Sequence, residues 1–183
     1  MILPIVQFGD PILRTVGGRV EKITDDIKGF VADMIETMRD AEGVGLAAQQ
    51  VAKPLQIAVV DVSGVEDRPS KMWVEGQEVN PDSYMPMILI NPELRFGKER
   101  VVGVEGCLSF PKMTADIVRF ERVHCQATTL EGTKLDFEAE GLLARALQHE
   151  VDHLNGVLFI DRMSSAAKAG LAGKLKRLMR AHK

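Results

Sequence analysis

The chain has 183 residues, the length of one domain, and its 45% hydrophobic and 27% charged residues are typical of a globular protein. Its 23 basic and 26 acidic residues give a formal net charge of −3, which offers DNA no bulk attraction. Two cysteines make no disulfide framework, no apolar run approaches the roughly 18 residues of a membrane span, and the N-terminus lacks the pattern of a secretory signal. We therefore expect a single cytoplasmic domain over residues 1–183, without membrane contact.

An amphipathic helix is the first element that the pattern predicts. Apolar residues recur at spacings of three and four between residues 24 and 42. Thr24 or Asp25 can cap its first turn, and Gly43 suits the left-handed residue that ends many helices.

A long polar segment, residues 63–84, separates two predicted strands. Apolar runs at residues 55–62 and 87–90 are typical of buried strands, and Asn91-Pro92 is expected to end the second. The segment between them is rich in Gly, Pro, Ser and charge and contains the only Trp and the only Tyr. Because structureless connections beyond about 12–15 residues are uncommon inside a domain, we interpret it as an insertion loop on the domain and not as a linker.

The last third of the chain predicts a hairpin and two helices. Residues 123–128 and 134–139 alternate between apolar and polar side chains, with a turn between them. Residues 140–154 have one apolar side and stop at Asn155-Gly156, which predicts a helix. A final basic helix is expected over about residues 165–180.

The helix at 140–154 contains the string His-Glu-Val-Asp-His at residues 149–153. Positions i and i+4 share one helix face, so His149 and His153 can both bind one metal ion. Glu150 is the residue that such sites use as a general base. The string specifies only three letters and also fits two solvated histidines, but the otherwise apolar helix favours buried ligands.

A catalytic ion needs a third protein ligand and one open position. The third histidine of metzincin proteases would fall at Phe159, and no Glu follows Glu150, so both zinc endopeptidase patterns lack their third ligand. Cys107 lies in a Gly-flanked segment and could approach a metal, although an ordinary core position is the alternative. Cys125 lies in an alternating strand and is expected in the core.

Three segments together resemble the signature motifs of the peptide deformylases. They are Gly43-Val44-Gly45-Leu46-Ala47-Ala48-Gln49-Gln50, Glu105-Gly106-Cys107-Leu108-Ser109 and Gln148-His149-Glu150-Val151-Asp152-His153. Their order and spacing match those of the family, and the likeness extends from Gly9-Asp10-Pro11 to Phe159-Ile160-Asp161-Arg162. The segment 63–84 and the stretch after Met163 depart from the family pattern without touching a motif.

The resemblance implies an α+β fold, with antiparallel sheets packed around a central helix that carries the His-Glu-x-x-His motif. It implies a hydrolase that removes the N-formyl group from N-formylmethionyl nascent chains and releases formate, with Glu150 as general base for attack by metal-bound water. It also implies one divalent ion, Fe²⁺ in the cell with Zn²⁺, Ni²⁺ or Co²⁺ possible, held by Cys107, His149 and His153.

The remaining site residues follow from the same resemblance. The Gln50 side-chain amide and the Leu108 backbone N–H would stabilise the oxyanion, and substrate binding falls to Gly43, Val44, Gly45 and Gly106. The glycines at 43 and 45 could instead simply end a helix and turn the chain. Only one of Gln49 and Gln50 is expected to face the site, and the motif register selects Gln50.

Three further points stay open. Glu105 and Arg119 could form an ion pair that steadies the Cys107 segment, or pair elsewhere. Seven basic residues and no acid lie between residues 162 and 183, a pattern typical of a solvated helix face and also of a contact with ribosomal RNA. A zinc endopeptidase and a non-catalytic metal module are the alternative functions, the latter disfavoured because structural zinc sites have four ligands.

Overall fold

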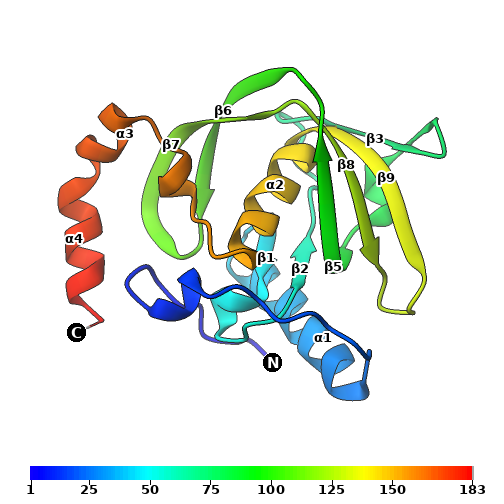
Figure 1. Cartoon of the computed structure of the whole chain (residues 1–183), viewed down its shortest axis with the longest axis horizontal. Coiled ribbons are helices and arrows are strands. Elements are labelled where there is room, and N and C mark those ends of the chain that lie inside the picture. The colour runs from blue at the N-terminus through cyan, green and yellow to red at the C-terminus, as the bar shows by residue number, and fades with distance from the viewer. Residues whose placement is uncertain (183) are drawn as a thin grey trace.

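The computed structural model describes residues 1–182, with helices and strands arranged as in Figure 1. The α-helices are α1 (Asp25–Asp40), α2 (Leu142–Leu154), α3 (Ser165–Gly170) and α4 (Ala172–Arg180). The strands are β1 (Gly45–Ala47), β2 (Ile57–Val60), β3 (Ser70–Val74), β4 (Gln77–Val79), β5 (Met87–Phe96), β6 (Arg100–Cys107), β7 (Phe110–Phe120), β8 (Arg122–Thr128) and β9 (Lys134–Gly141).

The strands form two antiparallel sheets of unequal size. Seven strands pair in the order β1-β2-β5-β8-β9-β3-β4, while β6 and β7 form a separate two-stranded hairpin. Helix α2 lies between the hairpin and the large sheet, as Figure 1 shows, and α1 packs against β1 and β2. The predicted α+β class, with antiparallel sheets around the motif helix, is confirmed.

Helix α2 is the buried centre of the molecule. Residues 142–150 are all buried, and the helix packs its leucines and alanines against the core of the large sheet. Five of its buried side chains are nevertheless polar: Arg145, Gln148, His149, Glu150 and His153. Because an unpaired polar group costs free energy when it is buried, Arg145, Gln148 and His149 take hydrogen-bond partners from β6 and β7.

The first helix begins as predicted but ends differently. The Thr24 side chain accepts a hydrogen bond from the Ile27 N–H at 3.3 Å and caps α1. The left-handed residue after the helix is Glu42, with φ of 56°, so the assignment of that conformation to Gly43 is wrong. A left-handed residue other than glycine is uncommon, and the pattern alone gives no sign of it.

The hairpin predicted near residues 123–139 is confirmed, whereas the end predicted for β5 is wrong. Strands β8 and β9 pair with Cys125 opposite Phe137, and both side chains are buried. Strand β5 continues past Asn91-Pro92 to Phe96, because a register irregularity between Ile90 and Glu93 absorbs the proline and a left-handed Asn91. Proline is tolerated in strands at such bulges.

Residues 63–84 are more ordered than the predicted loop. They contain β3 and β4, and β3 pairs with β9, which extends the large sheet at one end. The interpretation as an insertion remains a prediction.

The basic C-terminal segment forms two helices, with Leu171 between them, instead of one. Lys174, Lys176, Arg177 and Arg180 of α4 are exposed, and Leu175 is buried. Within residues 1–182, the helices are too short or too polar to cross a membrane.

Candidate metal centre and its cavity

Cys107, His149 and His153 converge on one point. Their ligand atoms all lie within 4.8 Å of one another, and Cys107 Sγ is 3.3 Å from His153 Nε2. The two imidazole rings come from successive turns of α2, with centroids 5.0 Å apart. Cys107 arrives from the end of β6, where the register of the hairpin shifts between Gly106 and Cys107. Such irregularities re-aim side chains next to functional sites.

A carboxylate behind the centre orients His149. Glu105 Oε1 lies 2.8 Å from His149 Nδ1, and Arg119 binds Glu105 through two hydrogen bonds of 2.8 and 2.9 Å. The contact between His149 and Glu105 directs the Nδ1–H of the imidazole at the carboxylate and leaves Nε2 free to bind a metal. Burial raises the pKa of the Glu105 carboxyl, but the hydrogen bonds from Arg119 and His149 outweigh it and hold that pKa well below its usual value. The pairing of Glu105 with Arg119 is thus confirmed.

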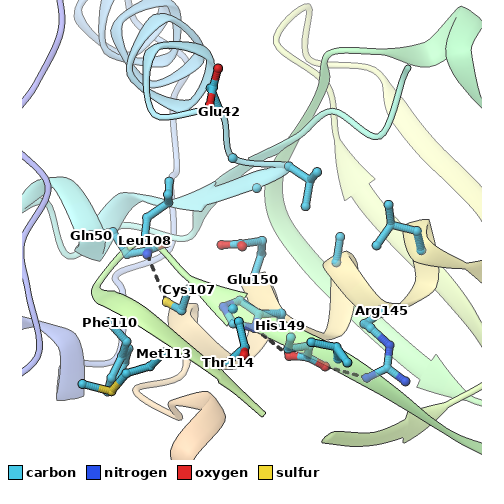
Figure 2. Close-up of a pocket in the computed structure, with 18 of the residues that line it drawn as sticks. Glu42, Gln50, Cys107, Leu108, Phe110, Met113, Thr114, Arg145, His149 and Glu150 are labelled. Atoms are coloured by element: carbon cyan, nitrogen blue, oxygen red, sulfur yellow. Dashed lines mark hydrogen bonds and ion pairs between the residues drawn. The ribbon is translucent and has the colours of Figure 1, made fainter. Parts of the chain in front are cut away.

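Glu150 is a buried carboxylate with an oxygen that has no partner. Its Oε2 atom accepts no hydrogen bond within the described residues, and burial raises the pKa of the carboxyl to about 7. A cation beside it would lower this pKa again, because an opposite charge favours the carboxylate. Figure 2 shows the Glu150 side chain above His149, facing the cavity.

Gln50 lies beside Cys107, and Gln49 does not. Gln50 Nε2 is 3.5 Å from Cys107 Sγ and donates to Ser109 Oγ at 3.1 Å, as Figure 2 shows in part. Its Oε1 accepts from the Ala47 N–H at 3.0 Å, so the side chain is held at both ends. Gln49 instead donates to the backbone carbonyls of Thr15 and Leu154.

A cavity of about 490 Å³ opens beside the centre. One wall is formed by residues 42–45, before and at the start of β1, and the opposite wall by residues 104–108 and 110–114 of the hairpin. All four residues predicted to bind substrate line this cavity, together with Gln50, Cys107, Leu108, His149 and Glu150. A Cβ atom at Gly43 would lie 2.8 Å from Leu108 Cδ1, so the two walls meet closely at this glycine.

Arg145, which none of the sequence motifs contains, also lines the cavity. Its side chain is buried and forms an ion pair of 2.8 Å with Glu105. One signal was available: an arginine stands between the leucines and alanines of an otherwise apolar helix segment.

The donor set fits a divalent metal ion. One thiolate and two imidazoles are ligands for zinc, iron, nickel or cobalt. Three protein ligands next to a cavity also leave a coordination position for water or substrate, as in catalytic sites and unlike four-ligand structural sites. Within residues 1–182, this is the single cluster of three such side chains close enough to share an ion.

Comparisons with known proteins find one family over nearly the whole chain. The profile of the polypeptide deformylase family matches residues 2–169. The peptide deformylase of Methylacidiphilum infernorum is 43% identical over 98% of this chain and 94% of its own length. The peptide deformylase of Opitutus terrae is 41% identical over 97% of this chain and 93% of its own length.

Solved structures agree with the family profile. The peptide deformylase of Ehrlichia chaffeensis superposes with a TM-score of 0.83 at 35% identity, covering 99% of this chain and 98% of its own. The peptide deformylase of Legionella pneumophila gives a TM-score of 0.80 at 32% identity, with coverage of 99% and 97%. The chain therefore belongs to the polypeptide deformylase family, metal-dependent hydrolases that remove the N-formyl group from polypeptides.

Proposed function

We propose that Cys107, His149 and His153 hold one divalent ion and that Glu150 is the general base and acid for hydrolysis of the formyl amide. The observation that carries this proposal is the convergence of three ligand atoms next to a buried carboxylate with an unpartnered oxygen, at one open cavity. We assign Fe²⁺ as the ion in the cell, while Zn²⁺, Ni²⁺ and Co²⁺ suit the same mixed sulfur and nitrogen donors.

The ion supplies a Lewis acid, which lowers the pKa of water and polarises a carbonyl. Glu150 accepts a proton from the attacking water and passes it to the nitrogen of the departing amine. This transfer is needed because an amine leaves poorly as an unprotonated anion. Burial raises the pKa of the Glu150 carboxyl and the proposed ion lowers it, so the two effects oppose each other at the group that must take up and release a proton.

Two donors are proposed for the oxyanion that develops on the formyl group. Gln50 Nε2 already lies beside Cys107, and the Leu108 N–H belongs to the next residue along the chain. One such donor is worth about 3–4 kcal/mol in the transition state. Both ends of the Gln50 side chain are hydrogen-bonded, so its amide is oriented before substrate arrives.

The substrate that we propose is an N-formylmethionyl peptide at the start of a nascent chain. Val44 contributes an apolar side chain to the cavity wall, and Gly43, Gly45 and Gly106 expose backbone there. Backbone without side chains lets an extended peptide approach closely. We place the enzyme in the cytoplasm, where such chains emerge from the ribosome.

A contact with the ribosome is proposed for the basic face of α4. Lys174, Lys176, Arg177 and Arg180 are exposed and have no acidic neighbour in the helix. Neutralising all four should weaken ribosome binding and flatten its salt dependence, because fewer counterions are released from RNA. Turnover of a free formyl peptide should not change. Equal ribosome affinity with and without these charges would leave α4 a solvated helix.

The decisive test of the proposed function combines metal content with turnover. Anaerobically purified protein should contain one divalent ion per chain and release formate from formyl-Met peptides without cleaving internal peptide bonds. Glu150→Gln should retain the ion and the fold but lose about 10²–10⁴-fold in turnover, the usual effect of removing a general acid–base. His149→Ala should lose the ion itself. Normal turnover by Glu150→Gln would remove the proposed base, and its failure to bind metal would make Glu150 a ligand or a structural residue.

A further inference from the structure

The ligands of the candidate metal centre come from two separately hydrogen-bonded parts of the fold. Cys107 belongs to the β6–β7 hairpin, which shares no strand pairing with the seven-stranded sheet. His149 and His153 belong to α2, which packs on that sheet. The separation between thiolate and imidazoles therefore depends on whatever fixes the hairpin against α2.

The side chain of Arg145 bridges these two parts. Arg145 lies one helical turn before His149 and is 6% exposed. Its Nη1 donates to Glu105 Oε2 and to the Ile117 carbonyl, both at 2.8 Å, and its Nη2 donates to the Val101 carbonyl at 2.9 Å. One guanidinium group on α2 thus binds both strands of the hairpin, and Figure 2 shows it at the end of the cavity away from Cys107.

Gly103 provides the space that this guanidinium occupies. A Cβ atom at Gly103 would lie 2.8 Å from Arg145 Cζ and 2.9 Å from both Nε and Nη2, closer than real Cβ contacts. Gly103 is not in the left-handed region, so conformational freedom is not what glycine provides here. The Gly103 carbonyl also lies 3.4 Å from Nη1. Positions 103 and 145 therefore depend on each other sterically.

The contact also reaches the carboxylate that orients His149. Glu105 accepts from Arg145 and Arg119 through Oε2 and faces His149 Nδ1 through Oε1. Hydrogen bonds between charged groups are short and strong, and the planar guanidinium has a fixed donor geometry. A shift of Arg145 would therefore alter both the hairpin position and the Glu105 contact to His149.

We propose that Arg145 and Gly103 form a positioning pair that holds the β6–β7 hairpin, and with it Cys107, at the separation from α2 that the metal centre requires. This inference rests on the proposed function only in that Cys107, His149 and His153 are taken as the metal ligands. Neither residue is given a role in the chemical step.

Three variants test the pair: Gly103→Ala, Arg145→Met and the double variant. Gly103→Ala keeps every hydrogen-bonding group and displaces the guanidinium by steric contact alone, so it remains informative if Arg145→Met folds poorly. We expect each single change to weaken Co²⁺ binding about 10–100-fold, the usual cost of removing a group that supports metal ligands. The double variant should be no weaker than Arg145→Met, because the added methyl group then meets no guanidinium.

Two readouts separate positioning from a general loss of stability. The thiolate-to-cobalt absorption band should shift in both single variants. Hydrogen exchange of the β6 amides should accelerate at least tenfold, while the exchange rate of the β2 amides should stay the same. Gly29→Ala and Arg122→Met are the controls, since Gly29 has no atom within 4 Å of an added Cβ and Arg122 pairs with Glu138 and Glu140 on the large sheet. Both controls should keep wild-type cobalt affinity and absorption.

Wild-type cobalt affinity and β6 exchange in either single variant would overturn the proposal, as would additive losses in the double variant. If the wild-type protein itself showed no thiolate-to-cobalt absorption, the metal assignment in the proposed function would fail instead. The exchange of β6 amides would then still decide whether the pair holds the hairpin, because that measurement does not depend on metal.

Discussion

Gly45 illustrates how a missing side chain determines the position of the proposed base. A Cβ atom at Gly45 would lie 2.6 Å from Glu150 Oε1 and 2.9 Å from Glu150 Cγ. The close approach includes Cγ as well as the carboxylate, so the whole end of the Glu150 side chain would have to shift. The backbone of Gly45 is not left-handed, so space alone requires glycine.

Gly45→Ala should therefore reduce turnover without unfolding the protein. Displacing the Glu150 carboxylate moves it out of line with the attacking water. We therefore expect kcat to fall by a factor approaching the roughly 10²–10⁴-fold that general acid–base groups contribute. The measurement is kcat on a formyl peptide together with Tm and metal content. Gly29→Ala, on the exposed part of α1, should leave kcat unchanged and raise stability by about 0.5–1 kcal/mol, as alanine does in helices. Unchanged kcat in Gly45→Ala would contradict the steric argument.

The sequence motifs located most of the candidate site at the residue scale. Helical spacing brings His149 and His153 together, and the motif register places Gln50 beside Cys107. Arg145 escaped notice because a single basic residue on a helix usually reaches solvent. Its burial depends on carbonyls of β6 and β7, which are 28 to 44 residues away in sequence.

At the scale of elements, strands were predicted either from short apolar runs or from the alternation of apolar and polar side chains. Strands β8 and β9 follow that alternation, and their pairing was recognised. Strands β6 and β7 were not recognised. Their exposed faces carry valines at 102, 104 and 118, so the sequence does not show the expected alternation of apolar and polar residues. The dipeptide Asn91-Pro92 likewise predicts an end to β5, whereas a register irregularity lets the strand continue past it.

Asn91 is the point at which β5 binds the N-terminal segment. Its side chain accepts from the Val20 N–H at 2.9 Å and donates to the Val20 carbonyl at 2.8 Å. Asn91→Ala should lower the free energy of unfolding by about 2–4 kcal/mol, since it leaves these groups unpaired and puts alanine in a left-handed conformation. Denaturant unfolding measures this loss.

Asn91→Gly separates the two contributions. Glycine adopts the left-handed conformation without strain, so this variant should lose only the hydrogen bonds and be the more stable of the two. Asn91 does not line the candidate active-site cavity, so kcat should stay at the wild-type value in both. Equal stability of the alanine and glycine variants would show that the backbone conformation contributes nothing.

For the whole molecule, the proposed metal centre joins the hairpin to the rest of the fold. We expect one cooperative unfolding transition, as for a single domain. Anaerobic removal of the ion by a chelator should lower Tm, because a ligand at 100 times its Kd stabilises the folded state by about 2.7 kcal/mol. Calorimetry with and without added metal tests this. A Tm that does not depend on metal would show that the ion does not stabilise the fold.

The two cysteines differ in a way that makes the chain its own indicator of metal loading. Cys125 is buried in β8, and burial raises the pKa of its thiol to about 12. Cys107 is partly exposed at the cavity. Alkylating reagents attack thiolates that they can reach, so iodoacetamide should modify Cys107 alone, and a bound ion should protect it. The fraction of alkylated chains in a mass spectrum then counts the molecules that lack metal.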